Sequence, residues 1–158
     1  MSEATLQNKS VIELSELKLV GFRILCPGEQ YVNEIPKATL QLSERISEIS
    51  NVINPFQQIG AFVVENETDN EDGYWICVEV NEYENIPDDM ISLTVPSQRY
   101  AVVRHKGPNN EIRDAYEVLH KWIEENNYLR LTNKWHLEKF NSWTDIENVD
   151  VELFDTIN

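Results

Sequence analysis

The residues best suited to chemistry lie in one short segment near the C-terminus, residues 135–140 (WHLEKF). Side chains of an extended strand alternate between its two faces. His136, Glu138 and Phe140 therefore share one face, and Trp135 points to the other. A carboxylate beside an aromatic ring suits a cationic aromatic ligand, because the anion supplies charge and the ring supplies apolar area and cation–π contact. We predict that His136, Glu138 and Phe140 bind a ligand.

The same face offers a second kind of chemistry. His136 and Glu138 would form an acid–base pair if both side chains faced a cleft. The sequence has no GxSxG nucleophile motif, no Walker loop and no GxGxxG motif. With five glycines in the chain, a phosphate-cradling loop is not expected. We therefore expect a binding protein rather than an enzyme. The enzyme alternative stays open, with Glu138 as its general base.

The histidines and cysteines form no pattern of metal ligands. Cys26 and Cys77 are far apart and belong to no CxxC pair, so a structural zinc site has no ligand set. We expect no metal and no cofactor. Cys77 is predicted to be a core residue, His105 a structural hydrogen-bonding residue in a Gly-Pro turn, and His120 a solvent-facing helix residue.

The net charge excludes some partners and favours others. Lys and Arg total 13 against 28 Asp and Glu, a formal charge of −15. Such a field repels phosphate backbones, so direct nucleic-acid binding is not expected, whereas a cationic ligand or a basic protein partner is compatible with it. Residues 1–10 are polar and no apolar run is long enough to span a bilayer. We expect a soluble cytoplasmic protein with no membrane contact.

The hydrophobic pattern predicts two helices among several strands. Residues 111–126 are the clearest helix, since their apolar side chains fall on one stripe. A first helix is expected within residues 32–53, with Pro36 in its first turn. An acidic stretch, residues 65–73, reads as a loop between two strands. The remaining extended segments are residues 11–24, 58–65, 74–83, 91–105, 135–143 and 149–157.

The order β-α-β-β occurs twice, and the residues support a duplication. Residues 15–30 and 96–111 align without a gap, so that Arg23 matches Arg104. We predict an α+β fold: a tandem β-α-β-β repeat of the SHS2 type, with repeats at about residues 11–83 and 91–157 in a single domain spanning 1–158. The repeats would form one bent antiparallel sheet, with both helices on one face and, on the other, a ligand cleft on the pseudo-twofold axis.

The same comparison matches two tryptophans. The segment Gly73-Tyr74-Trp75 resembles residues 133–135, which places Trp75 and Trp135 at equivalent positions of the two repeats. They are candidate walls of the cleft, and a buried structural role is the alternative. Tyr74 is a further candidate for the pocket, and Trp143 would cover either the mouth of the cleft or the end of the sheet.

The second half of the chain resembles the GyrI-like (AraC-type) effector-binding family. Residues 99–128 fit the family pattern of an extended "YAVF-H-GP" stretch followed by a helix with "AY--L--W". The segment DGYWICVEV (residues 72–80) is similar to the family's "YW-GVEV" strand, with Cys77 where Gly is common. The segments LEKFNSW (137–143) and VELFDTI (151–157) resemble its last two strands. The resemblance covers about residues 11–157.

The resemblance implies a function and several site residues. Glu138 matches the family's cleft glutamate, and Phe140 stands where Tyr is common, which puts one hydrogen bond in doubt. Tyr31 precedes the first helix, where members often place a pocket-lining side chain. Members usually bind hydrophobic, often cationic, small molecules, and some are fused to a helix-turn-helix domain. Here we expect a stand-alone member with no DNA-binding domain before Val11.

Three functions follow, and we favour the first. The chain would bind a small hydrophobic or cationic molecule as a sensor, as an accessory to a transcription regulator, or as a multidrug-binding protein that sequesters its ligand. Alternatively, it would hydrolyse strained electrophilic molecules with Glu138 as general base, its pKa raised by a dry pocket. In the third case, its acidic surface would bind a basic protein partner such as a DNA-handling enzyme, as a gyrase inhibitor does.

Overall fold

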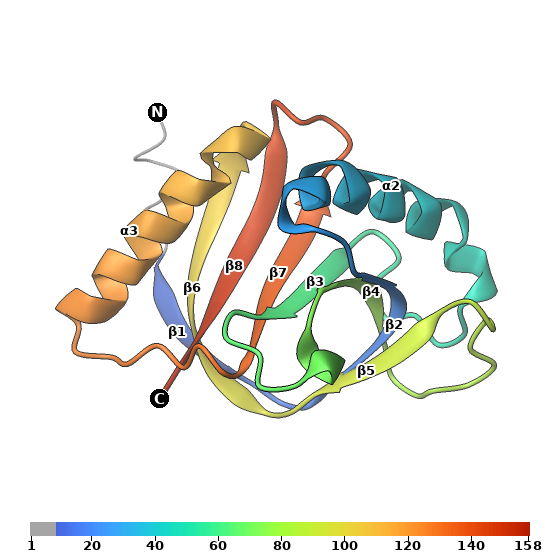
Figure 1. Cartoon of the computed structure of the whole chain (residues 1–158), viewed down its shortest axis with the longest axis horizontal. Coiled ribbons are helices and arrows are strands. Elements are labelled where there is room, and N and C mark those ends of the chain that lie inside the picture. Colours follow the sequence, from blue (N-terminus) through green and yellow to red (C-terminus); the bar gives the residue numbers. More distant parts are fainter. Residues whose placement is uncertain (1–8) are drawn as a thin grey trace.

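The computed structural model describes residues 9–158, and the sequence prediction for residues 1–8 lies outside them. Eight strands in the described residues form one antiparallel sheet, and two helices cover part of it (Figure 1). The order across the sheet is β1-β6-β8-β7-β3-β4-β2-β5. The helices are α2 (Tyr31–Glu44) and α3 (Ile112–Glu125). The strands are β1 (Ser10–Leu14), β2 (Leu17–Ile24), β3 (Gln58–Val63), β4 (Tyr74–Val80), β5 (Ile91–Val95), β6 (Gln98–Gly107), β7 (Trp135–Ser142) and β8 (Val149–Ile157).

The α+β class and the bent antiparallel sheet are confirmed, and some element boundaries differ from the prediction. The first extended segment is two strands, β1 and β2, because the chain turns at Ser15 and Glu16. The helix α2 begins at Tyr31, so Pro36 lies inside it rather than in its first turn. Pro36 has no N–H, and the carbonyl group of Val32 therefore lacks its helical donor.

The duplication extends further than the aligned segment. The boundaries of β1 and α2 recur in β5 and α3 at a constant spacing of 81 residues. The short 3₁₀ turns before the helices, Gly28–Gln30 and Asn109–Glu111, keep the same spacing. Each repeat therefore has the order β-β-α-β-β, one strand more than the sequence predicted.

The first strand of each repeat pairs with the other repeat. β1 precedes β2 in the chain but pairs with β6, and β5 precedes β6 but pairs with β2. The turns that carry the chain across lie close together, since the Ser97 hydroxyl donates a hydrogen bond to the Leu14 carbonyl (3.0 Å). The two repeats are interlocked through these exchanged strands.

The pseudo-twofold axis passes between β3 and β7, the central pair of the sheet. Gly60 of β3 lies opposite Glu138 of β7. The registers of the pairs β2–β4 and β4–β3 match those of β6–β8 and β8–β7. By this match Gly60 and Glu138 occupy equivalent positions in the two repeats. The proposed match of Trp75 with Trp135 is wrong, because Trp75 lies in β4, the counterpart of β8, and Trp135 lies in β7, the counterpart of β3.

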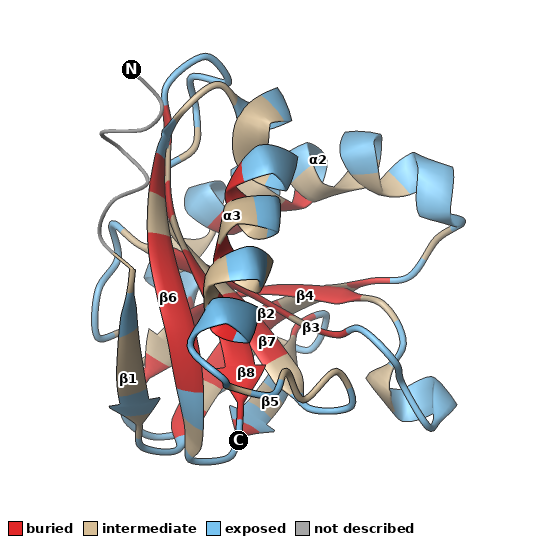
Figure 2. Ribbon diagram, turned by 90° about the vertical axis from the view of Figure 1, so that its left-hand side faces the viewer, coloured by how far each residue is buried: buried red, intermediate tan, exposed pale blue. Residues whose placement is uncertain are grey.

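Both helices pack on the same face of the sheet, as predicted. The helix α2 covers β2 and β4, and α3 covers β6 and β8, each over its own apolar cluster. The opposite face is not a cleft, which corrects the prediction: the sheet bends around a third apolar cluster that includes Trp75, Tyr100 and Phe154. Figure 2 shows buried residues concentrated in strands such as β6 and β4, whereas the helices α2 and α3 carry many exposed positions. Large aromatic side chains pack together on the concave side of the sheet.

Candidate functional site

A cleft lies on the helix face, between α2 and α3. The helix α2 packs on β2 and β4, and α3 packs on β6 and β8. The central strands β3 and β7 therefore remain uncovered between the two helices. The cleft has a volume of about 210 Å³. Among the described residues that line it, Glu138 is the one charged side chain. The others are Tyr31, Val32, Ile35, Pro36, Thr39, Tyr74, Asn109, Ile112, Phe140, Trp143, Ile146 and Val149.

Two tyrosines donate hydrogen bonds to the Glu138 carboxylate. The Tyr74 hydroxyl, from β4, lies 2.6 Å from Oε1, and the Tyr116 hydroxyl, from α3, lies 2.5 Å from Oε2. Each oxygen therefore accepts one hydroxyl, which fixes the plane of the carboxylate. The tyrosines come from different repeats but from positions that are not counterparts, so the site is asymmetric.

Gly60 makes room for one of these hydrogen bonds. A Cβ atom at this position would lie 1.8 Å from the Tyr74 hydroxyl oxygen. Because glycine has no side chain, the Tyr74 ring can cross above Gly60 and reach Glu138 on the neighbouring strand. Glycine is required here by the close approach of the ring rather than by backbone conformation.

Burial dominates the electrostatics of the site. It raises the pKa of Glu138 above its ordinary value, and this outweighs the hydrogen bonds from Tyr116 and Tyr74 and the charge of His136, which all act to lower it. Burial, followed by the Glu138 charge, raises the pKa of both tyrosines well above 10. The tyrosines therefore remain protonated donors, and the carboxylate gains from any positive charge, a proton included, that enters the cleft.

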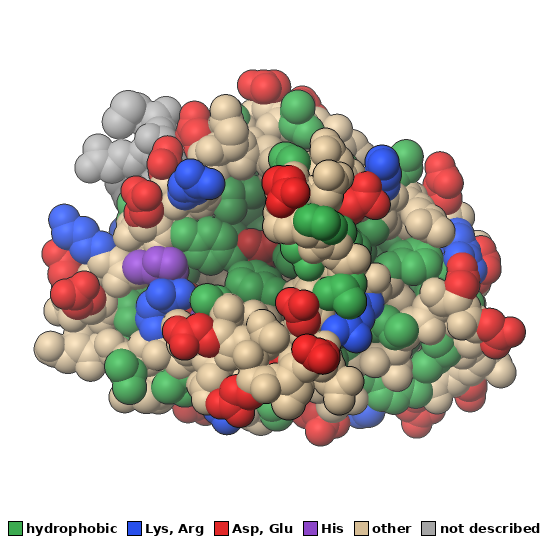
Figure 3. Space-filling model, in the orientation of Figure 1, with side chains coloured by type: hydrophobic (Ala, Val, Ile, Leu, Met, Phe, Trp, Pro, Cys, Tyr) green, Lys and Arg blue, Asp and Glu red, His purple; other side chains and the backbone are tan. Residues whose placement is uncertain are grey.

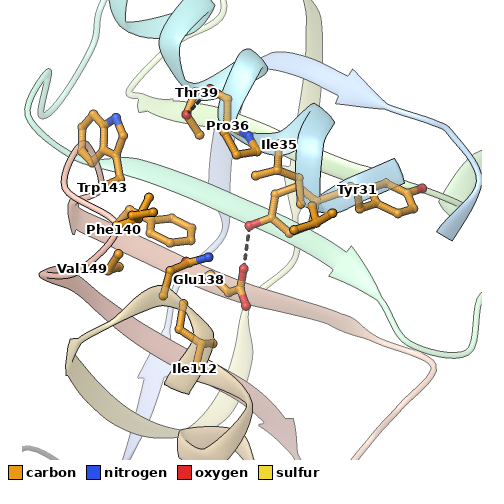
Figure 4. A pocket seen from close by; sticks show the side chains of 13 residues that line it. Tyr31, Ile35, Pro36, Thr39, Ile112, Glu138, Phe140, Trp143 and Val149 are labelled. Atoms are coloured by element: carbon orange, nitrogen blue, oxygen red, sulfur yellow. Dashed lines mark hydrogen bonds between the residues drawn. The ribbon is translucent and has the colours of Figure 1, made fainter. Parts of the chain in front are cut away.

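The structure brings together four of the predicted site residues. Glu138, Phe140, Tyr74 and Tyr31 all line the cleft. In Figure 4, Glu138 lies between Tyr31 on one side and Phe140 and Trp143 on the other. Trp143 is at the cleft rather than at a distant end of the sheet.

Trp75 and Trp135 are not brought to the cleft. Their rings meet in a T-shaped contact, with centroids 4.9 Å apart, inside the aromatic cluster on the opposite face. Strand alternation is the reason, because Trp75 follows the cleft residue Tyr74 and Trp135 is an odd number of residues from Glu138. The predicted cleft-wall role is wrong for both, and the structural alternative holds.

His136 shares the face of Glu138, as predicted, but does not pair with it. Its Nε2 lies 3.2 Å from the Leu131 carbonyl oxygen, and its Nδ1 lies 2.8 Å from Oδ1 of Asp155. Its ring stacks on Phe62, with centroids 5.7 Å apart. Both ring nitrogens are engaged elsewhere, so the geometry does not support the His136–Glu138 acid–base pair.

Asp155 is buried at the centre of a small charged group. His120 Nε2 and Arg130 Nε lie 2.8 and 2.9 Å from its Oδ2. Burial alone would raise the pKa of Asp155, but His120, His136 and Arg130 outweigh it and hold the pKa below its ordinary value. His120, predicted to be a solvent-facing helix residue, is partly exposed but also contacts the buried Asp155 and so joins α3 to β8.

The remaining predictions concern isolated residues. His105 Nε2 lies 3.0 Å from the Pro108 carbonyl oxygen, which confirms its structural role, and Cys77 is fully buried. Among the described residues, no three His, Cys, Asp or Glu side chains are close enough to hold a metal ion. No helix in that part of the chain is long and apolar enough to cross a membrane.

Two residues near the site, Tyr116 and Asp155, are not among those that the sequence predicts. A signal existed for Tyr116, because a hydroxyl on a buried stripe needs a polar partner. The sequence could not show that this partner is Glu138, 22 residues away.

Comparison with known proteins places these features in a family. The sequence profile of a family described as integron-associated effector binding protein matches residues 10–154. A search of curated proteins found no match to the sequence.

Several solved structures share the fold at low sequence identity. SAV2435 bound to tetraphenylphosphonium has a TM-score of 0.73 and 16% identity, over 96% of this chain and 94% of that one. The C-terminal domain of EcmrR has a TM-score of 0.68 and 19% identity, over 96% and 97% of the two chains. In a complex of EcmrR with DNA, the match covers 57% of the regulator's length. An integron cassette protein from Vibrio cholerae has a TM-score of 0.60 and 11% identity, over 97% of both chains.

Proposed function

Since the chain belongs to the integron-associated effector binding proteins, a GyrI-like effector-binding family, we propose that it binds small apolar organic cations in the cleft at Glu138. The family and its structural neighbours support a small-molecule-binding domain. The ligand class is our proposal, and it rests on the chemistry of the cleft.

One observation supports the cation most strongly: a single carboxylate at the floor of a cleft whose other walls are uncharged. Burial makes the ionised form of Glu138 costly, and the residues lining the cleft supply no positive charge to offset it. A cation entering the cleft would offset the cost of burying the ionised carboxylate. The rings of Phe140, Trp143 and Tyr31 offer apolar area and cation–π contact. Neutral molecules of the same shape would gain only the apolar contribution.

We further propose that ligand binding serves sensing, through a protein partner, or sequestration of a drug-like molecule. A domain with this fold forms part of EcmrR, which binds DNA in the solved complex. The present chain has a formal charge of −15, which favours action through a basic protein rather than through DNA. The two free cysteines, Cys26 and Cys77, agree with a reducing compartment such as the cytoplasm.

The test is a binding titration with tetraphenylphosphonium as the cation and triphenylphosphine oxide as a neutral analogue. We expect the wild type to bind the cation more tightly, and Glu138→Gln to lose at least about ten-fold in affinity, since a charged contact in a partly dry site is worth roughly 1.5–3 kcal/mol. Glu117→Gln, at an exposed position on α3, removes the same charge outside the cleft and serves as the matched control. Equal binding of the two probes, or equal losses in the two variants, would refute the proposal.

The raised pKa of Glu138 also favours a second candidate, a hydrolase with Glu138 as general base. It has less support, because both carboxylate oxygens already accept tyrosine hydroxyls and His136 is turned away. Incubation with styrene oxide separates the two functions. If the wild type forms the diol and Glu138→Gln does not, the protein is a hydrolase. If the epoxide remains unchanged, the binding function is supported instead.

A further inference from the structure

A second hollow lies next to the cleft, on the other side of Tyr116. It has a volume of about 470 Å³ and shares the wall residue Ile112 with the cleft. Phe62, Val64 and the Tyr116 ring form its apolar walls. Figure 3 shows Lys or Arg side chains and a His around hydrophobic atoms beside α3, at the left of the view.

Apart from the Tyr116 hydroxyl, which donates to Glu138, the polar side chains of this hollow are all basic or imidazole groups. They are Arg113, His120, Arg130 and His136, and no acidic residue lines it. In a chain with 28 acidic and 13 basic residues, this is a local reversal of charge. It is also opposite to the cleft, where the one charged lining residue is an acid.

The buried Asp155 accounts for only part of this charge. Its carboxylate is contacted by His120, Arg130 and His136. Arg113 makes no such contact: no acidic side chain of the described residues pairs with it, and it lies exposed in the first turn of α3, at the rim of the hollow. A group of basic residues assembled only to hold Asp155 would not need Arg113.

We propose that this hollow binds the carboxylate of an apolar aromatic molecule. A guanidinium presents two parallel N–H donors that match the two oxygens of a carboxylate. Arg113 supplies this fork, and Arg130 adds positive potential beside it. The aromatic part of the ligand lies against Phe62 and Tyr116, which are held in place by contacts with Tyr74, His136 and Glu138. This ligand class is opposite in charge to that of the cleft, and the inference does not depend on the cation proposal.

The experiment compares 2-naphthoate with its neutral amide, 2-naphthamide, by calorimetric titration of the full chain. We expect naphthoate to bind more tightly, and added salt to weaken only naphthoate, because the arginines are partly exposed. Arg113→Gln should weaken naphthoate at least about five-fold and leave naphthamide unchanged, as a charge-assisted hydrogen bond is lost.

The control is Lys121→Gln, which removes the same charge from an exposed position of the same helix, outside the hollow. Thermal denaturation of both variants checks that they fold. The proposal is overturned if naphthoate does not bind the wild type, if it binds no better than naphthamide, or if Lys121→Gln weakens it as much as Arg113→Gln.

Discussion

At the scale of single residues, Glu138 is a carboxylate whose charge depends on what shares the cleft. Its pKa is raised by burial, while Tyr74 and Tyr116 stabilise the ionised form. Protons and organic cations should therefore compete for the same group, and binding should be linked to pH.

The first prediction concerns this competition. Affinity for tetraphenylphosphonium should rise with pH from about 4.5 upward, through the raised pKa of Glu138, and then level off. Lower pH protonates the carboxylate and removes the charge that the cation needs. Titrations at a series of pH values measure the effect, and Glu138→Gln should give a nearly flat profile. A wild-type profile that is equally flat would exclude Glu138 as the anion.

The second prediction concerns the stability of the ligand-free protein, which should fall with rising pH because of the same carboxyl group, Glu138. A carboxylate whose pKa is raised in the folded state binds its proton more tightly there than in the unfolded chain. Its contribution to stability is present at low pH and is lost as pH rises through the folded-state pKa. Without ligand, wild type should therefore lose stability relative to Glu138→Gln over that range, as thermal denaturation of both proteins would measure. A difference that is constant with pH would contradict the raised pKa.

Part of the site could be predicted from the sequence at this scale. Strand alternation placed Glu138, Phe140 and His136 on one face correctly, because one strand decides it. The partners of these side chains come from other elements: Tyr116 from α3, and Asp155 from β8. No pattern within a strand can show which hydroxyl or carboxylate a fold brings against it, and the His136–Glu138 pairing failed for that reason.

At the scale of elements, the cleft depends on how closely the Tyr74 side chain of β4 packs over the neighbouring strand β3. The Tyr74 ring crosses Gly60 with no room for a side chain. The hydrogen bond from Tyr74 to Glu138 therefore depends on the absence of a Cβ atom at position 60 of β3.

Gly60→Ala tests this fit. The added methyl group would displace the Tyr74 hydroxyl or push the strands apart, so we expect a loss of roughly 1–3 kcal/mol in the free energy of unfolding and weaker binding of the cation. Chemical denaturation and ligand titration measure the two effects. Gly28→Ala is the matched control, because a Cβ atom there meets nothing within 4 Å. Equal stability of the two variants would mean that the ring moves aside at little cost.

Element types were easier to predict than element partners. The helix α3 was predicted to within a residue, because its apolar stripe is a local feature. The strand β1 was merged with β2, since nothing in a run of Val, Ile and Leu marks where one strand stops and its chain crosses to another repeat. The position of the cleft was predicted on the wrong face, because the bend of the sheet is a property of all eight strands together.

At the scale of the whole molecule, the exchange of β1 and β5 ties the repeats into one folding unit. Each repeat lacks its outer strand unless the other repeat is present. The aromatic cluster that fills the concave face also draws residues from both halves, among them Trp75 and Phe154.

This arrangement predicts the behaviour of fragments cut in the loop after Asn85. Neither residues 1–85 nor residues 86–158 alone should unfold cooperatively, because each would expose an unpaired strand edge and half of the shared cluster. An equimolar mixture should recover near-ultraviolet circular dichroism and a single unfolding transition. A cooperative transition in either isolated fragment would show that the exchanged strand is dispensable.

The place of Gly60 and Glu138 on the pseudo-twofold axis has a consequence for what duplication makes possible. Two identical subunits related by a true twofold axis would carry the same residue at both positions. A glutamate there would appear twice, side by side on paired strands, and the two charges would repel each other, whereas two glycines would leave no charge at all. A duplicated chain whose halves have diverged can carry one acid on the axis and, beside it, a glycine that leaves room for the Tyr74 ring. The cleft then has a single charge and two unlike sides.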